Sequence, residues 1–384
     1  MLFYELLQVA IGNRNELSHT PASEEWRELY HLALRQALVG IAFRGVEQLP
    51  EHQRPPKTLL MQWYVAAERI KVMNSDLDRK ALAVANKFLE EGFRSVILKG
   101  QGVAKLYQVS QIGNGQLTID NGHPEGEFST LNSQFSISNY RTPGDIDIWL
   151  EGGREKILDY VRRYVPDCRV VYHHVDFPVV DGLDVEVHFF PSWLNSPITN
   201  RRLQRFFHRC AEGFFVESSS VLTELPCPNL AFNRVYILLH IYHHLFYEGI
   251  GLRQLMDYYF VLYQGFSEDE CAETMRVLRS LKMERFAAAV MWVLQKVFGM
   301  DDSYLITAPN EREGRFLLNE IMLAGNFGKY DERLQHERGE SSIHWALRKI
   351  KRNFRFVRSY PSEVLWSPLW KIWHWCWRKS KGYL

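Results

Sequence analysis

The chain has 384 residues, of which 46% are apolar and 24% are charged, a composition typical of a globular protein with two or three domains. The formal net charge of +1 produces no overall field that would attract nucleic acid, so we predict no specific DNA binding. Five scattered cysteines without a C-x-x-C pair argue against a cysteine zinc site and against a disulfide framework.

Residues 1–92 are predicted to be helical. They begin without a basic segment before an apolar run, and no stretch of the chain reaches the roughly 20 apolar residues of a membrane span, so we expect a cytoplasmic protein. A helix start is predicted at Thr20-Pro21, because two glutamates follow near the positive end of the helix dipole. Helical patterns also cover residues 59–71 and 77–91. We expect these helices to pack as a bundle against a sheet.

Residues 95–107 have the pattern of a short buried strand, a glycine turn and the start of a helix. Such a turn presents free backbone N–H groups and the positive end of a helix dipole, which suit a phosphate group. It is made by Lys99, Gly100, Gln101 and Gly102, and it matches neither a Walker loop nor a dinucleotide fingerprint. Lys99 is placed either to neutralise a phosphate or to point into solvent.

Residues 110–140 are polar and rich in glycine, asparagine and serine, which is typical of an inserted loop or a small hairpin. Short strands are conceivable at 116–119 and 135–137. The insertion leads directly into the next motif, so it either closes over a substrate or forms a surface insertion without a role in chemistry.

The turn Pro143-Gly144 is followed by Asp145-Ile146-Asp147-Ile148, an alternation with the period of a strand. Both aspartates therefore point to the same face of that strand. Two neighbouring carboxylates repel one another unless a cation lies between them, and hard oxygen ligands suit Mg²⁺ or Mn²⁺. The alternative is a solvent-facing edge strand that carries two ordinary acids.

A helix at 154–165 and two strands at 169–175 and 183–190 are predicted next, the strands as a hairpin. Asp184, Glu186 and His188 share one face of the second strand, which makes a third carboxylate available. His173 and His174 precede them in the hairpin. Because adjacent strand residues face opposite ways, at most one of this pair would point with Glu186, and we do not predict a zinc site.

Residues 196–340 are predicted to be a second helical region. His240 and His244 lie on one helix face, but Ile241 replaces the glutamate that a zinc-protease motif requires, so a packing or substrate-lining role is expected. Arg253 and Asp257 are also four residues apart. They form either a simple helix ion pair or a helix that directs Arg253 toward the substrate.

Residues 341–384 contain ten lysines and arginines, a single acid and six tryptophans. The stripe Trp366, Trp370, Trp373 and Trp377 has helical spacing. We expect these tryptophans to pack into the core, and contact with a membrane surface or an acidic partner is the second interpretation.

The order and spacing of three motifs resemble the DNA polymerase β-like nucleotidyltransferase superfamily. The segments Leu98-Lys99-Gly100, Gly144-Asp145-Ile146-Asp147 and Val185-Glu186-Val187-His188 are similar to those of a largely uncharacterised bacterial nucleotidyltransferase family, and Gly325-Asn326-Phe327-Gly328 and Tyr360-Pro361-Ser362-Glu363 resemble its later segments. One departure is that Gly100 is followed by Gln101, where the superfamily usually has a serine that contacts the nucleotide phosphates.

The predicted elements and the resemblance imply an α+β fold. A small mixed β-sheet nucleotidyltransferase core at 93–195 is flanked by the helical regions 1–92 and 196–340 and by the basic, tryptophan-rich segment 341–384. The resemblance implies transfer of a nucleoside monophosphate group from a nucleoside triphosphate to an unidentified hydroxyl acceptor, with release of pyrophosphate. The alternatives are a catalytically silent nucleotide- or partner-binding relative, and a membrane-associated enzyme of surface polysaccharide synthesis.

The resemblance also assigns roles to residues. Asp145, Asp147 and Glu186 would be catalytic and would bind Mg²⁺ or Mn²⁺. The nucleoside triphosphate would be bound by Lys99, Gly100, Gln101, Gly102, Arg141 and Arg253.

Overall fold

The computed structural model describes residues 1–110, 134–178, 182–215, 221–334 and 341–383. These residues are mostly helical and include one four-stranded mixed sheet, which confirms the predicted α+β class. The helices are α1 (Leu2–Ala10), α2 (Ser23–Arg35), α3 (Val39–Gln48), α4 (Lys57–Glu90), α5 (Gln101–Ala104), α6 (Gly153–Tyr164), α7 (Pro197–Phe214), α8 (Leu230–Tyr247), α9 (Leu252–Tyr263), α10 (Glu268–Ser280), α11 (Glu284–Val293), α12 (Glu311–Ala324), α13 (Ser342–Phe354) and α14 (Pro361–Ser380). The strands are β1 (Ser95–Ile97), β2 (Gln108–Ser110), β3 (Gln134–Ser136), β4 (Ile146–Leu150), β5 (His174–Asp176) and β6 (Val185–His188).

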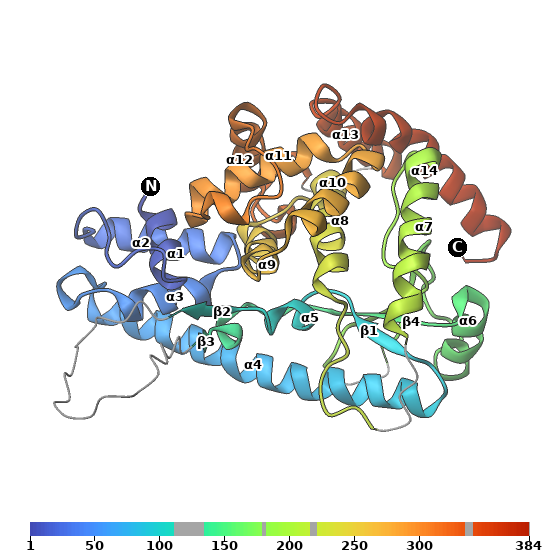
Figure 1. Ribbon diagram of the computed structural model, residues 1–384, viewed down its shortest axis with the longest axis horizontal. Helices are drawn as coiled ribbons and strands as arrows, with labels where there is room; N and C mark the ends of the chain where they lie inside the picture. The colour runs from blue at the N-terminus through green and yellow to red at the C-terminus, as the bar shows by residue number, and fades with distance from the viewer. Residues whose placement is uncertain (111–133, 179–181, 216–220, 335–340, 384) are drawn as a thin grey trace.

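Helix α4 is the longest of these helices and runs along most of the length of the molecule (Figure 1). It joins the two helical stretches predicted at 59–71 and 77–91 into one helix of 34 residues. The helix start predicted at Thr20-Pro21 lies slightly later, because α2 begins at Ser23 and the Glu25 side chain accepts a hydrogen bond from the Ala22 N–H. Glu25 therefore caps α2 near Ala22, two residues after the cap that the sequence pattern predicted at Thr20.

The N-terminal helices are divided between two hydrophobic cores. The C-terminal half of α4 packs with α6 on one face of the sheet, through residues such as Ala85 and Phe88. Helices α1 to α3 lie at one end of the molecule, beside α9 and α12 (Figure 1), and the Gln8 side chain donates to the Val297 carbonyl. The expected bundle against the sheet therefore holds for α4, whereas α1 packs on helices from much later in the chain.

The main sheet has the strand order β1-β4-β6-β5. Strand β4 pairs antiparallel with β1 and parallel with β6, and β5 and β6 form the predicted hairpin, shorter than expected. Every residue of β4 is buried, so the interpretation of this stretch as a solvent-facing edge strand is wrong. Trp149 of β4 packs against Phe207 of α7 and Phe232 of α8, which places these helices on the second face of the sheet.

The polar insertion is described only at its ends. Strands β2 and β3 pair antiparallel there, and β3 corresponds to the short strand predicted at 135–137. The other strand predicted for the insertion, at 116–119, lies outside the described residues.

The basic C-terminal segment ends in α14, which lies at the end of the molecule opposite α1 to α3 (Figure 1). Trp370 faces inward and stacks on Trp193 with ring centroids 5.2 Å apart. Trp366 and Trp373, which were expected to pack in the core, are 38% and 47% exposed. Among the described helices, none combines the length and the apolar character that a bilayer crossing requires.

Candidate functional site

The register of the sheet aligns polar side chains in two rows on one face. Directly opposed residues of paired strands lie on the same face, about 5 Å apart. Asp147 of β4 is opposite Glu186 of β6, and Glu186 is opposite Asp176 of β5, which makes an acidic row. His188 is opposite both Trp149 and His174, which makes a histidine row next to it. The polar face of this sheet therefore follows from strand alternation and register together.

The three carboxylates predicted from the sequence converge. Single oxygen atoms of Asp145, Asp147 and Glu186 all lie within 4.8 Å of one another. Asp147 is 2% exposed, whereas about one third of the Asp145 and Glu186 side chains is accessible. Carboxylates this close repel one another in a site with little water, so the arrangement requires positive charge nearby.

Lys99 supplies part of that positive charge. The alternative interpretation, in which Lys99 points into solvent, is therefore wrong. Its Nζ lies 2.9 Å from Asp147 Oδ2 and 3.2 Å from Asp145 Oδ2. Burial opposes the charged form of the lysine, but the coulombic attraction of Asp147, Asp145 and Glu186 outweighs burial and raises its pKa. Burial likewise opposes ionisation of Asp147, yet Lys99 and a hydrogen bond from His188 lower the pKa of this carboxyl.

His188 links the two rows. Its Nε2 lies 2.9 Å from Asp147 Oδ1 and 3.6 Å from Glu186 Oε2. Burial acts to lower the pKa of His188, but the hydrogen bonds to Asp147 and Glu186 outweigh it and raise the pKa to about 9. Burial also acts against the ionised form of Glu186, and the hydrogen bond from His188 and the attraction of His174 lower the pKa of this carboxyl.

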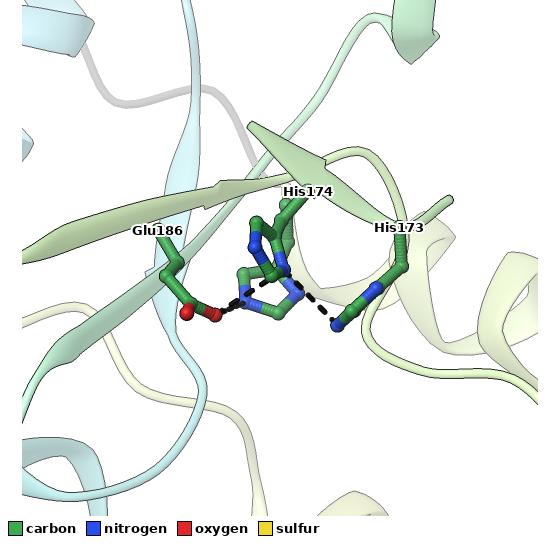
Figure 2. A group of neighbouring side chains, drawn as sticks. His173, His174 and Glu186 are labelled. Atoms are coloured by element: carbon green, nitrogen blue, oxygen red, sulfur yellow. Dashed lines mark hydrogen bonds and ion pairs between the residues drawn. The ribbon is translucent and has the colours of Figure 1, made fainter. Parts of the chain in front are cut away.

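His173 and His174 both point toward Glu186, as Figure 2 shows, so the prediction that they diverge is wrong. The cause is local: β5 begins at His174, and His173 lies in a bend before it, where the alternation of a strand does not apply. His173 Nε2 lies 3.1 Å from His174 Nδ1, which lies 3.2 Å from Glu186 Oε2 (Figure 2).

The glycine turn backs Lys99, but it is not the helix terminus that the pattern predicted. Helix α5 is one turn of four residues, and the N–H groups of Gly102, Val103 and Ala104 already donate to carbonyls of Lys99 and Gly100. Gly102 is required because a Cβ there would lie 2.3 Å from the Ile97 carbonyl oxygen. The helix is therefore shorter than the pattern predicted, and phosphate binding by this turn stays a prediction.

Gln101 points away from the carboxylates. Its Nε2 donates to Asp78 Oδ1 of α4 at 2.6 Å, and its side chain is buried. Asn74, one turn earlier on α4, donates to the carbonyls of Asn139 and Arg141. Helix α4 therefore holds both loops that carry the site residues.

Arg141 and Arg253 have different surroundings. Arg141 forms a buried bidentate pair with Asp257, with Nε–Oδ1 and Nη2–Oδ2 distances of 2.7 and 2.8 Å. Asp257 therefore pairs with Arg141 instead of with Arg253, the partner that the helix spacing suggested. Arg253 instead donates to the carbonyls of Thr142 and Pro143, directly before Asp145. Burial and repulsion by Arg141 lower the pKa of Arg253 to about 10.

A cavity of about 1000 Å³ opens over the sheet face and contains all three carboxylates and Lys99. Half of the chain's 14 histidines line it, among them His240 and His244, whose role toward a substrate stays a prediction. The opposite wall is aromatic and includes Trp193, Trp370 and Phe327. A smaller polar crevice beside Asp145 is lined by Arg253, Arg141 and Phe327.

Sequence reasoning missed this aromatic wall. Phe327 lies over the Arg253 guanidinium, 5.4 Å from ring centroid to Cζ, and adopts the strained positive φ of 53° that non-glycine residues rarely have. Trp193 follows β6 by only five residues, a position that signals proximity to Glu186 once the strand is known. Trp370 comes from the far end of the chain, and its place at the site follows from tertiary packing alone.

Comparison with known families adds one finding. The family model described as "Uncharacterised nucleotidyltransferase" matches residues 22–112 and 131–299. The match contains Lys99, Asp145, Asp147, Glu186 and Arg253, and it ends before the segments 325–328 and 360–363. Neither a curated protein nor a solved structure matches the sequence.

Proposed function

Since the chain belongs to the uncharacterised nucleotidyltransferase family, we propose that it transfers a nucleoside monophosphate group from a nucleoside triphosphate to a hydroxyl acceptor and releases pyrophosphate. The observation that carries this proposal is the convergence of Asp145, Asp147 and Glu186 in a cavity large enough for a nucleotide. These carboxylates are the residues that we assign to catalysis.

The donor set fits Mg²⁺ or Mn²⁺. All three groups offer hard carboxylate oxygens. The Lys99 ammonium contacts both Asp145 and Asp147, so the space between these two carboxylates favours a cation. When bound, the divalent ions would neutralise charge on the triphosphate and would acidify the acceptor hydroxyl.

The protein groups would divide the remaining work. Asp145 and Lys99 face the cavity, where Lys99 would contact triphosphate oxygens. The acceptor oxygen would bond to the α-phosphorus as the bond from that phosphorus to the α–β bridging oxygen breaks, and pyrophosphate would leave. Glu186 would accept the hydroxyl proton, since it faces the cavity beside Asp145 and Asp147.

We assign triphosphate binding to the neighbouring turn and to one arginine. Gly100 leaves its side open toward Asp145, and Arg253 lines the polar crevice beside that aspartate. Gly102 and Gln101 would shape the turn, through close packing on β1 and the bond to Asp78. Arg141 would act as a positioning residue, because Asp257 accepts from its Nε and Nη2 and the Thr142 carbonyl accepts from its Nη1.

The test is a transfer assay with labelled triphosphates. Purified protein is incubated with each of four α-labelled nucleoside triphosphates, Mg²⁺ and a cell extract, and labelled products are identified by mass spectrometry. We expect one acceptor class to be labelled by wild type and not by the Asp145→Asn, Asp147→Asn double variant. Equal labelling by both proteins would refute the assignment, and triphosphate binding in calorimetry without any transfer would identify a catalytically silent relative.

A specific observation favours membrane-surface association as an additional property. The outer face of α14 carries a stripe of apolar residues that are each more than half exposed, namely Leu365, Leu369, Ile372 and Trp375. The segment 341–384 has ten basic residues against one acid, and that acid, Glu363, is buried. A stripe of this kind with basic flanks fits the interface of an anionic bilayer.

Flotation with phosphatidylserine vesicles tests this association. We expect wild type to float with anionic vesicles and not with neutral ones, and Leu369→Glu, Ile372→Glu to reduce the floated fraction at least fivefold. Val72→Glu on α4 is the matched control, because Val72 is an equally exposed apolar residue far from the basic segment in sequence. Equal flotation of wild type and the α14 variant would contradict the proposal.

A further inference from the structure

A second group of side chains converges beside the carboxylates. One ligand atom from each of His173, His174, His188 and Glu186 lies within 4.8 Å of the ligand atoms of the other three. We propose that these four groups bind a zinc-type divalent transition-metal ion, distinct from the Mg²⁺ or Mn²⁺ of the carboxylate group, with Glu186 shared between the two sites. This proposal does not depend on nucleotidyl transfer.

The spacing of the four atoms matches tetrahedral coordination. Zinc bonds of about 2.0–2.1 Å to nitrogen and oxygen at tetrahedral angles place neighbouring ligand atoms about 3.3 Å apart. Three of the observed distances are 3.1 Å between His173 and His174, 3.2 Å between His174 and Glu186, and 3.6 Å between His188 and Glu186. Small side-chain adjustments would therefore complete the geometry without movement of the strands.

His174 lies between two carboxylates. Its Nδ1 faces Glu186 Oε2 at 3.2 Å, and its Nε2 faces Asp176 Oδ1 at 3.4 Å. With a metal ion at Nδ1, the N–H at Nε2 would donate to Asp176, the arrangement that orients metal-binding histidines in other proteins.

The donor chemistry separates this site from its neighbour. Three imidazoles and one carboxylate favour zinc and similar transition metals, whereas three carboxylates favour Mg²⁺ or Mn²⁺. Four protein ligands also close a tetrahedron, as structural zinc sites do. The ion would therefore tie the bend at His173 to β5 and β6 and would hold Glu186 in place beside the other two carboxylates.

The binding experiment uses the full chain. Metal is removed with a chelator, the protein is dialysed against zinc with millimolar Mg²⁺ present, and bound zinc is measured by elemental mass spectrometry. We expect one zinc ion per chain for wild type and a loss of at least tenfold in zinc affinity for His173→Ala, His174→Ala. Cobalt in place of zinc should give the visible absorption of a tetrahedral site in wild type only.

Three variants make the outcome unambiguous. His240→Ala, which removes a cavity histidine outside the cluster, should keep one zinc ion. His173→Gln changes a half-buried residue outside the strand and serves if the double variant does not fold. Asp145→Asn should keep zinc while it loses Mg²⁺-dependent transfer, so failure of the zinc site and failure of the proposed activity are distinguishable. The proposal would be overturned if wild type bound less than about one fifth of a zinc ion per chain in this assay. It would also be overturned if the double variant His173→Ala, His174→Ala and the variant His173→Gln both bound zinc as tightly as wild type.

Discussion

The sheet side and the helical side of the cavity differ in almost every property. The sheet side carries charged groups, with Asp147 and Glu186 aligned by strand register and Lys99 contacting Asp147 from the turn after β1. The helical side carries aromatic rings from segments far apart in the chain, such as Trp193 and Trp370. Under the proposed function, the sheet would carry the chemistry and the helices would shape the space in which an acceptor binds.

The largest expected effect tests the sheet side. Asp145→Asn should lower the transfer rate roughly a thousandfold, because it removes about 4 kcal/mol of charge stabilisation from the reaction. The fold should persist, because one third of the Asp145 side chain is accessible. Single-turnover transfer of labelled nucleotide measures the rate, and Asp159→Asn on the exposed side of α6 is the control. A loss below tenfold would remove Asp145 from the catalytic group.

Lys99→Gln should produce the next effect. Removal of the ammonium leaves Asp147 and Asp145 without their nearest positive charge, so we expect transfer to fall about a hundredfold and the free energy of unfolding to fall by about 3 kcal/mol without divalent metal. Added Mg²⁺ should raise the melting temperature of the variant more than that of wild type, because the ion replaces the lost charge. The exposed Lys105→Gln serves as control. An equal response to Mg²⁺ in both proteins would contradict a shared cation site.

Trp370→Ala tests the helical side. The ring lines the cavity on α14, so we expect KM for the acceptor to rise about tenfold with kcat within twofold of wild type. Trp375→Ala on the outer face of α14 is the matched control and should leave both constants unchanged. A fall in kcat without a change in KM would place Trp370 with the catalytic residues instead.

The smallest effect on transfer is expected at Glu363, which joins α14 to the site wall by accepting hydrogen bonds from the Asn195 N–H. Burial raises the pKa of Glu363 to about 8, so its protonated form is the stable one in the folded chain. The stability it contributes is therefore complete below its unfolded pKa, near 4.5, and is lost as the pH rises through about 8.

Denaturant unfolding of wild type and Glu363→Gln between pH 5 and 8 measures this contribution. The free energy of unfolding of wild type should fall relative to the variant by at most about 1.4 kcal/mol per pH unit. The nearby Tyr242 and Tyr247 do not interfere, because burial raises the pKa of both phenols. A difference that is constant across this range would show that Glu363 does not change its protonation in the folded protein.

The site also shows how far local patterns reach. The alternation of Asp145, Ile146 and Asp147 predicted correctly that both carboxylates converge, although Asp145 lies one residue before β4 begins. The same rule failed at His173, which lies in a bend one residue before β5, so alternation alone does not decide the direction of a side chain at a strand end. The glycine turn was predicted correctly, but the helix after it has only four residues. The apolar pattern did not reveal that this helix is so short.

The sequence by itself determined the α+β class, the family and the three carboxylates, because each depends on short-range periodicity and on motif order. The tertiary structure decided which groups meet. It placed Lys99 between the aspartates, paired Arg141 with Asp257 and brought α14 to the cavity. These outcomes depend on strand register and on packing between segments more than one hundred residues apart, which no local pattern encodes.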